Sequence, residues 1–182
     1  MSERCGLLVL GLGNVLLGDD GLGPVAVARL QRSLEIPAGM RVADGGTLGL
    51  ALLALIAESD DVILVDAVRR DAPAGTLVRI ESEEVAPAVR ERLSPHQVGV
   101  ADLLDAARLT ACYPRSVTLL GLVPQKIDLS IERSEVVEKG LNALVEAIVR
   151  EARSLGYKLV ARTDAGHYDN RSDHGAARCL GL

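Results

Sequence analysis

Short apolar runs alternate along this sequence with segments of helical spacing, and this alternation limits the fold more than any other feature. Runs at residues 7–13, 61–68 and 116–124 have the length and composition of strands buried on both faces of a parallel sheet. Helical patterns separate them, and strands joined by helices form right-handed crossovers. The sequence therefore predicts an α/β fold of three layers, in which helices sandwich a mostly parallel twisted sheet of about five strands.

The remaining elements complete this alternation. Further strands are expected at residues 40–47 and 75–82, the second at a sheet edge, and helices from residue 23 and at 48–58, 98–110 and 134–155. The apolar composition of 48–58 predicts a well-buried helix. From Lys158 onward the chain is polar and aperiodic. We therefore expect a single domain at residues 1–157 and a disordered tail at residues 158–182.

Composition excludes several classes of protein. The chain has 182 residues, a formal net charge of −5 and no basic block, whereas nucleic-acid binders need clustered Lys and Arg. The longest uncharged stretch, Cys5 to Gly18, is too short to span a bilayer as a helix, and residues 1–4 do not begin a secretory signal. The three cysteines are too scattered for a disulfide framework or a CxxC metal site. We therefore expect a reduced, cytoplasmic protein without membrane insertion, acting as a monomer.

Acidic residues follow three of the expected strands. The pair Asp19–Asp20 follows the first strand, Asp44 ends the second, and Asp66 lies in the third. His96 is the only histidine before the polar tail. Ligands of open α/β sheets bind beyond the carboxyl ends of the strands, so these residues are expected to converge. Two carboxylates and an imidazole are typical of a divalent metal site that keeps a position open for a substrate ligand.

Each of these residues also has a structural interpretation. Asp19 or Asp20 could cap the following helix, because a carboxylate pairs with the free amides of a helix N-terminus. Asp44 could order its Gly-Gly turn. His96 could be an ordinary loop histidine or the neighbour of the N-cap of the next helix. Asp66 is harder to explain in this way, because an ionised carboxylate in an apolar strand costs several kcal/mol unless it is paired or metal-bound.

Other enzyme classes fit the sequence less well. A dinucleotide-binding site would use Gly11 and Gly13 as its fingerprint and Asp44 as its ribose acid, but Leu16 stands where the third glycine belongs. The aspartate pair would also repel a pyrophosphate. The G-x-S-x-G elbow of serine hydrolases is missing, and no cysteine is well placed as a nucleophile.

Four motifs together resemble a known family. They are "GLGNVLLGDDGLGP" at 11–24, "DGGTLG" at 44–49, "ILVDAV" at 63–68 and "SPHQVGVADLL" at 94–104. In this order and spacing the chain resembles the hydrogenase maturation endopeptidases, which process nickel–iron hydrogenases. The resemblance implies an endopeptidase that removes a C-terminal extension from the hydrogenase large-subunit precursor after nickel insertion. It also implies a twisted parallel sheet sandwiched by helices.

The resemblance also assigns roles to residues. The nickel-contacting positions of the family fall on Asp20, where the family has Glu or Asp, and on Asp66 and His96. Asp44 matches a further acid, which is expected to contact the substrate or to orient the site. Nickel would be carried by the substrate and bound weakly or not at all by the free enzyme. Whether the metal activates water or a carboxylate acts as general base stays open. The alternative function is a non-proteolytic nickel-binding assembly factor that docks the large subunit.

Overall fold

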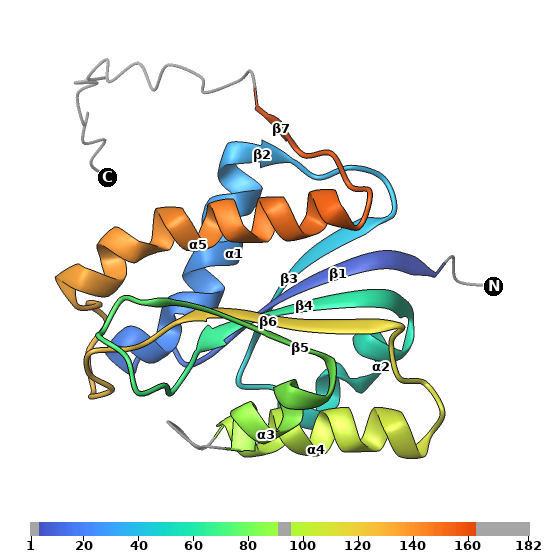
Figure 1. The fold of residues 1–182 in the computed structure, drawn as a ribbon, viewed down its shortest axis with the longest axis horizontal. Coiled ribbons are helices and arrows are strands. Elements are labelled where there is room, and N and C mark those ends of the chain that lie inside the picture. Colours follow the sequence, from blue (N-terminus) through green and yellow to red (C-terminus); the bar gives the residue numbers. More distant parts are fainter. Residues whose placement is uncertain (1–3, 91–95, 163–182) are drawn as a thin grey trace, which may run out of the picture.

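The computed structural model describes residues 4–90 and 96–162, except for the side chains of residues 89, 90 and 96–99. The central sheet consists of β1 (Cys5–Leu12), β3 (Met40–Gly46), β4 (Ser59–Ala67), β5 (Leu77–Glu81) and β6 (Ser116–Leu122). Its strand order is β3-β1-β4-β6-β5, and β5 alone runs antiparallel, at one edge (Figure 1). The predicted fold class, a mostly parallel five-stranded sheet between helices, is confirmed.

Two helical layers cover this sheet. In Figure 1, α1 (Leu22–Ser33) and α5 (Glu135–Ser154) lie on one face, and α2 (Leu53–Ala57), α3 (Val85–Arg90) and α4 (His96–Leu109) lie on the other. Successive strand residues point to opposite faces, so Leu7 and Val9 of β1 pack with α1 and α5 while Leu8 and Leu10 belong to the other core cluster. Both faces of the sheet are therefore buried, as the continuous apolar runs predict.

Helix α5 begins where the sequence predicts. Ser134 is its N-cap, and its Oγ accepts a hydrogen bond from the Val137 amide at 3.5 Å. Glu138, in the first turn, forms ion pairs with Arg29 of α1 and with Arg133. Partial burial raises the pKa of Glu138, but Arg133 and Arg29 outweigh this effect and hold the pKa below its ordinary value. The paired carboxylate thus joins α1 to the start of α5.

The prediction of one well-buried helix at residues 48–58 is wrong. This segment forms a short 3₁₀ helix, η2 (Gly49–Leu52), followed by the five-residue α2. Gly46 and Gly49 have φ values of +46° and +52°, which an α-helix does not contain. Leu48 and Leu50 are consequently exposed to solvent, and Leu52 and Ile56 supply the buried contacts.

Ordered structure continues past the expected domain boundary at residue 157. Strand β7 (Val160–Ala161) pairs antiparallel with β2 (Leu34–Glu35), and Leu159 is buried in the core. The Arg162 amide donates a hydrogen bond to the Ser33 carbonyl oxygen at 3.0 Å. Residues 158–162 are therefore part of the folded unit, and residues 163–182 of the predicted tail lie outside the described residues.

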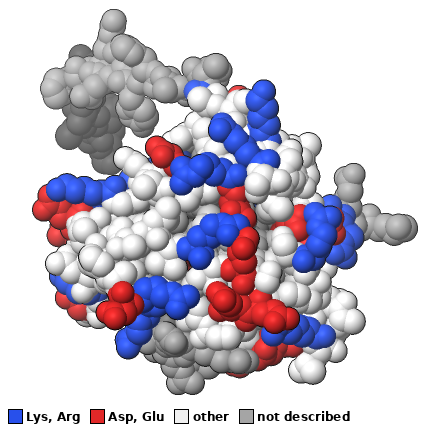
Figure 2. Space-filling view, viewed as in Figure 1, with Lys and Arg blue, Asp and Glu red and all other residues white. Residues whose placement is uncertain are grey.

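The surface shows no dominant sign of charge on the face drawn in Figure 2, where acidic and basic side chains are interspersed. Within residues 4–90 and 96–162, no helix combines the length and the apolar character that crossing a membrane requires.

Candidate active site

The strand order places a ligand-binding position at the carboxyl ends of β1 and β4. The chain leaves β1 through α1 toward β3 on one side, and it leaves β4 toward β5 and β6 on the other side. Ligands of open α/β sheets bind at such a change of direction. Asp20 lies in η1 (Gly18–Gly21), which follows β1, and Asp66 is the penultimate residue of β4. The predicted convergence of these two acids is therefore built into the topology.

The glycines of the turn at 11–23 allow its backbone to fold closely on the strand ends. A Cβ atom at Gly23 would lie 2.2 Å from the carbonyl oxygens of both Leu12 and Val65. A Cβ atom at Gly13, where φ is +123°, would lie 1.9 Å from the Asp20 carbonyl oxygen and 3.7 Å from Asp66 Oδ1. These glycines thus bring the Asp20 backbone and the Asp66 carboxylate to the end of β1.

Asp20 and Asp66 are both buried, at 0% and 1% exposure. Oδ2 of Asp20 accepts a hydrogen bond from the Asn14 amide at 2.8 Å, and Oδ1 of Asp66 accepts one from the Ala67 amide at 2.8 Å. Backbone amides therefore fix the orientation of both carboxylates. Two oriented carboxylates at one sheet edge can contribute oxygen ligands to a cation or accept a proton from water.

Asp19 has a different task from its neighbour. Its Oδ2 accepts hydrogen bonds from the amides of Gln125 at 2.8 Å and Lys126 at 3.1 Å, and from Ser134 Oγ at 2.8 Å. Its Oδ1 accepts one from the Ser134 amide at 2.6 Å. The carboxylate thus fastens the β6–α5 loop to η1. Neither acid caps α1, whose N-cap is Gly21 with no side-chain hydrogen bond. The only sign in the sequence that Asp19 has a special role is its position in the Asp19–Asp20 pair, and this pair does not indicate that Asp19 anchors a loop.

Asp44 does not join the other two acids in a metal-binding group. It pairs with Gly11 in the β3–β1 ladder, and its exposed carboxylate accepts a hydrogen bond from the Gly46 amide at 2.9 Å. This is the turn-ordering contact that its position before two glycines allows. Among the described side chains, no three His, Cys, Asp or Glu residues form a cluster that could hold a metal ion.

His96 is the first residue of α4. This helix packs against η2, which follows the turn that contains Asp44, and Figure 1 shows it starting at the same end of the molecule as the carboxyl ends of β1, β4 and β6. The backbone of α4 thus begins near the candidate site. The His96 side chain lies outside the described residues, so its role as a ligand stays a prediction.

Comparison with known proteins identifies the family. The sequence profile of the hydrogenase maturation protease family matches residues 24–151. Hydrogenase 2 maturation protease of Escherichia coli K12 is 35% identical over 158 residues, which cover 86% of this chain and 96% of the relative. The chain belongs to the hydrogenase maturation protease family.

Solved structures of the family agree with this assignment. The hydrogenase maturating endopeptidase HybD of E. coli superposes with a TM-score of 0.84 at 34% identity, over 88% of this chain and 99% of that one. The [NiFe] hydrogenase maturation protease HybD of Thermococcus kodakarensis gives a TM-score of 0.68 at 28% identity, over 81% and 99%. The protein is therefore an endopeptidase of hydrogenase maturation. The family profile covers Asp66 and His96, and Asp20 lies just before its start.

Proposed function

We propose that this protease removes the C-terminal extension of a nickel–iron hydrogenase large-subunit precursor after nickel has been inserted, and that the substrate's nickel is the recognition element. The observation that carries the proposal is the position of Asp20 and Asp66, two buried acids at the switch point of the sheet, where Gly13 adjoins the Asp20 backbone and the Asp66 carboxylate. Carboxylate oxygens are ligands that divalent cations accept, so two of them at this position suit the binding of a substrate's metal ion.

The donor set fits an ion that is shared with the substrate. Asp20, Asp66 and His96 would supply two carboxylates and one imidazole, whereas closed metal sites generally use four ligands. Thiolates of the substrate would complete the coordination of its nickel. The free enzyme would then hold nickel weakly or not at all, and a precursor without nickel would lack the shared contact.

The same carboxylates also suit the hydrolytic step. Attack of water on a peptide bond needs an acceptor for the proton of the water, and a fixed carboxylate can be that base. Asp20 and Asp66 are each oriented by a backbone amide. Asp44, which is exposed beside the end of β1, would contact the substrate from the rim of the site.

Mass spectrometry of the precursor after incubation with chelator-treated enzyme tests the proposal. We expect the nickel-loaded precursor to lose a discrete C-terminal fragment and the nickel-free precursor to keep its full mass. A hundredfold preference corresponds to about 2.7 kcal/mol, which one or two metal–ligand bonds can supply. Efficient cleavage of the nickel-free precursor would contradict nickel-dependent recognition. A stable complex with unchanged mass would instead favour the non-proteolytic assembly factor.

A further inference from the structure

Exposed aliphatic side chains gather around the candidate active site. Within the described residues, six large ones lie on the three loops at the carboxyl ends of β1, β3 and β6: Val15, Leu16, Leu48, Leu50, Leu129 and Ile131. We call these six residues the apolar rim. Of the three other comparably exposed side chains in the described chain, Leu77 lies beside the end of β6, and Leu109 and Val160 lie elsewhere. Single exposed aliphatic residues are ordinary, but a group of them at one place marks an interaction surface.

The loops of the rim are held together by backbone hydrogen bonds. The Gly18 amide donates to the Ser130 carbonyl oxygen at 2.7 Å, and the Ser130 amide donates to the Leu16 carbonyl oxygen at 3.0 Å. On the other side, the Gly13 amide donates to the Gly46 carbonyl oxygen at 3.0 Å. The carboxylate of Asp19 anchors the β6–α5 loop as well. The rim thus presents its side chains from a fixed backbone.

A fixed backbone suits the rim to binding. Leu129 and Ile131 are 87% and 75% exposed although the loop that carries them is anchored at several points. Because the loop is already ordered, a partner that covers these side chains gains apolar burial and pays little for ordering the loop.

We infer that the apolar rim is the docking surface for the folded part of the hydrogenase precursor that adjoins the extension. This inference rests on the proposed function. The scissile segment must reach Asp20 and Asp66, so the rest of the substrate must cover the loops that surround them. Those loops come from both sides of β1, so that a surface wider than one extended segment is needed to cover all three.

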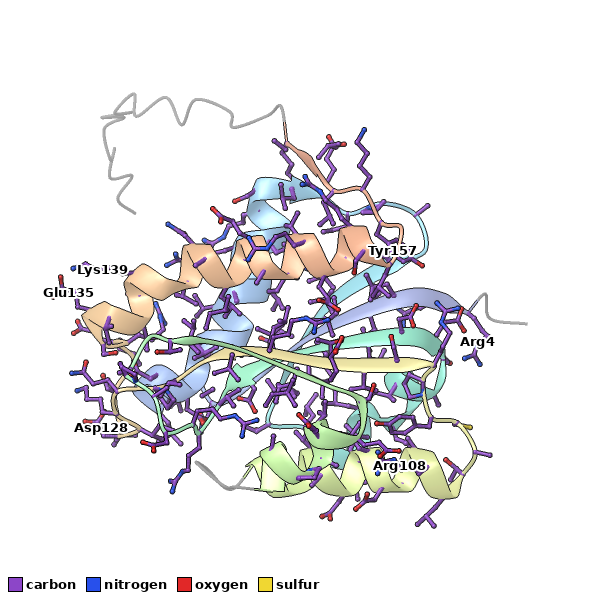
Figure 3. All side chains as sticks on the ribbon, viewed as in Figure 1. Arg4, Arg108, Asp128, Glu135, Lys139 and Tyr157 are labelled. Atoms are coloured by element: carbon purple, nitrogen blue, oxygen red, sulfur yellow. The ribbon has the colours of Figure 1, made fainter. Side chains whose placement is uncertain are left out.

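The chemistry of the rim favours an apolar partner surface over a charged one. Lys126 and Asp128, which precede Leu129, form an ion pair with each other at 3.3 Å. Figure 3 places Asp128 at this end of the molecule, together with Glu135 and Lys139, which also pair with each other. Charges of both signs therefore border the rim and two pairs of them are neutralised within the protein, which favours aliphatic contact as the main source of affinity.

The test compares two leucines of equal exposure. Leu129 in the rim is 87% exposed, and Leu109 at the far end of α4 is 88% exposed. We expect Leu129→Asp to raise the KM for nickel-loaded precursor about tenfold or more, as loss of an interface anchor does, with kcat at saturation nearly unchanged. Leu109→Asp should leave both constants at the wild-type values. Melting temperatures of both variants check that the fold is intact, and Leu48→Asp repeats the test on a second loop.

Equal kinetics of Leu129→Asp, Leu48→Asp and Leu109→Asp would overturn the inference. Calorimetric measurement of precursor binding distinguishes a failure of this inference from a failure of the proposed function. If the wild type binds but does not cut, and Leu129→Asp weakens that binding, the proposed function fails and the docking surface stands. If the wild type does not bind the precursor, both fail. If sedimentation shows a wild-type dimer that Leu129→Asp dissociates while precursor binding is unchanged, the rim joins two copies of this chain and the inference is wrong.

Discussion

The two ends of the sheet hold buried carboxylates in different ways. At the amino end, Asp61 is 1% exposed, forms an ion pair with Arg115 and accepts a hydrogen bond from Ser116 Oγ at 2.7 Å. At the carboxyl end, Asp20 and Asp66 accept hydrogen bonds from backbone amides. The ion pair of Asp61 lies at the end of the sheet away from the ligand-binding position, whereas Asp20 and Asp66 lie at the switch point, where ligands of such sheets bind. The comparison indicates that the amino end serves stability and the carboxyl end serves chemistry.

Replacing the acids by their amides is the strongest test of this comparison. Asp20→Asn and Asp66→Asn should each lower the rate of precursor processing about a hundredfold or more, because the amide can neither accept a proton nor act as an anionic ligand. Asp61→Asn should lower the melting temperature, because it breaks the pair with Arg115, and should process at the wild-type rate per folded molecule. Processing rates and thermal melts measure both effects.

The reverse pattern would contradict the assignment of the two ends. If Asp20→Asn and Asp66→Asn unfold while retaining activity in their folded fraction, these acids are structural. Thermal melts of both variants separate these outcomes, because a structural acid lowers the melting temperature when it is replaced.

Most of the fold could be predicted because its central strands are buried on both faces. β1, β4 and β6 are built around apolar runs, and α5 shows one apolar face. Strands β2 and β7 could not be predicted, because two residues are too few for a periodic pattern and Leu34 pairs with Ala161 far along the chain. The prediction of a long helix at 48–58 was wrong because the presence of a glycine at position 49 does not by itself show that its φ is positive.

The candidate site could be predicted in part. Asp20 and Asp66 could be placed because the acids follow strands whose carboxyl ends share one edge of the sheet. The role of Asp19 could not be predicted, because three of its four hydrogen-bond donors are backbone amides, and the sequence does not show which backbone amides will act as donors. Asp44 shows the limit of motif reasoning, since its described contact is the ordinary one of a turn.

The second test of the comparison between the two ends of the sheet uses two glycines with positive φ, Gly13 at the carboxyl end and Gly156 at the amino end. A methyl group at Gly13 would meet the Asp20 carbonyl oxygen at 1.9 Å, whereas one at Gly156, where φ is +93°, would have no atom within 4 Å. We expect Gly13→Ala to lower the free energy of unfolding by about 3 kcal/mol or more, and to impair processing. Gly156→Ala should cost only the backbone strain, about 1–2 kcal/mol, and leave processing intact. Chemical denaturation measures the difference. Equal losses of unfolding free energy in the two variants would show that the backbone around Gly13 can shift to accommodate a methyl group.

The smallest expected effect concerns the segment beyond residue 157. Leu159 is 2% exposed and Val160 is 44% exposed. Leu159→Ala should lower the free energy of unfolding by about 2–3 kcal/mol, and Val160→Ala by about 0.5 kcal/mol or less. Processing per folded molecule should be unchanged in both, because the segment lies away from the carboxyl ends of the strands. Denaturation curves with no difference between the two variants would place the end of the folded unit before Leu159.

The hydrogen bonds of Asp19 also set the order in which the protein can be completed during synthesis. Asp19 leaves the ribosome early, but the donors that hold its carboxylate follow 106 to 115 residues later. Contacts between such distant residues form late, because the intervening chain must first be ordered. A nascent chain that ends before Ser134 therefore lacks the anchored loop, and the protease becomes competent only when nearly all of its folded unit has been made.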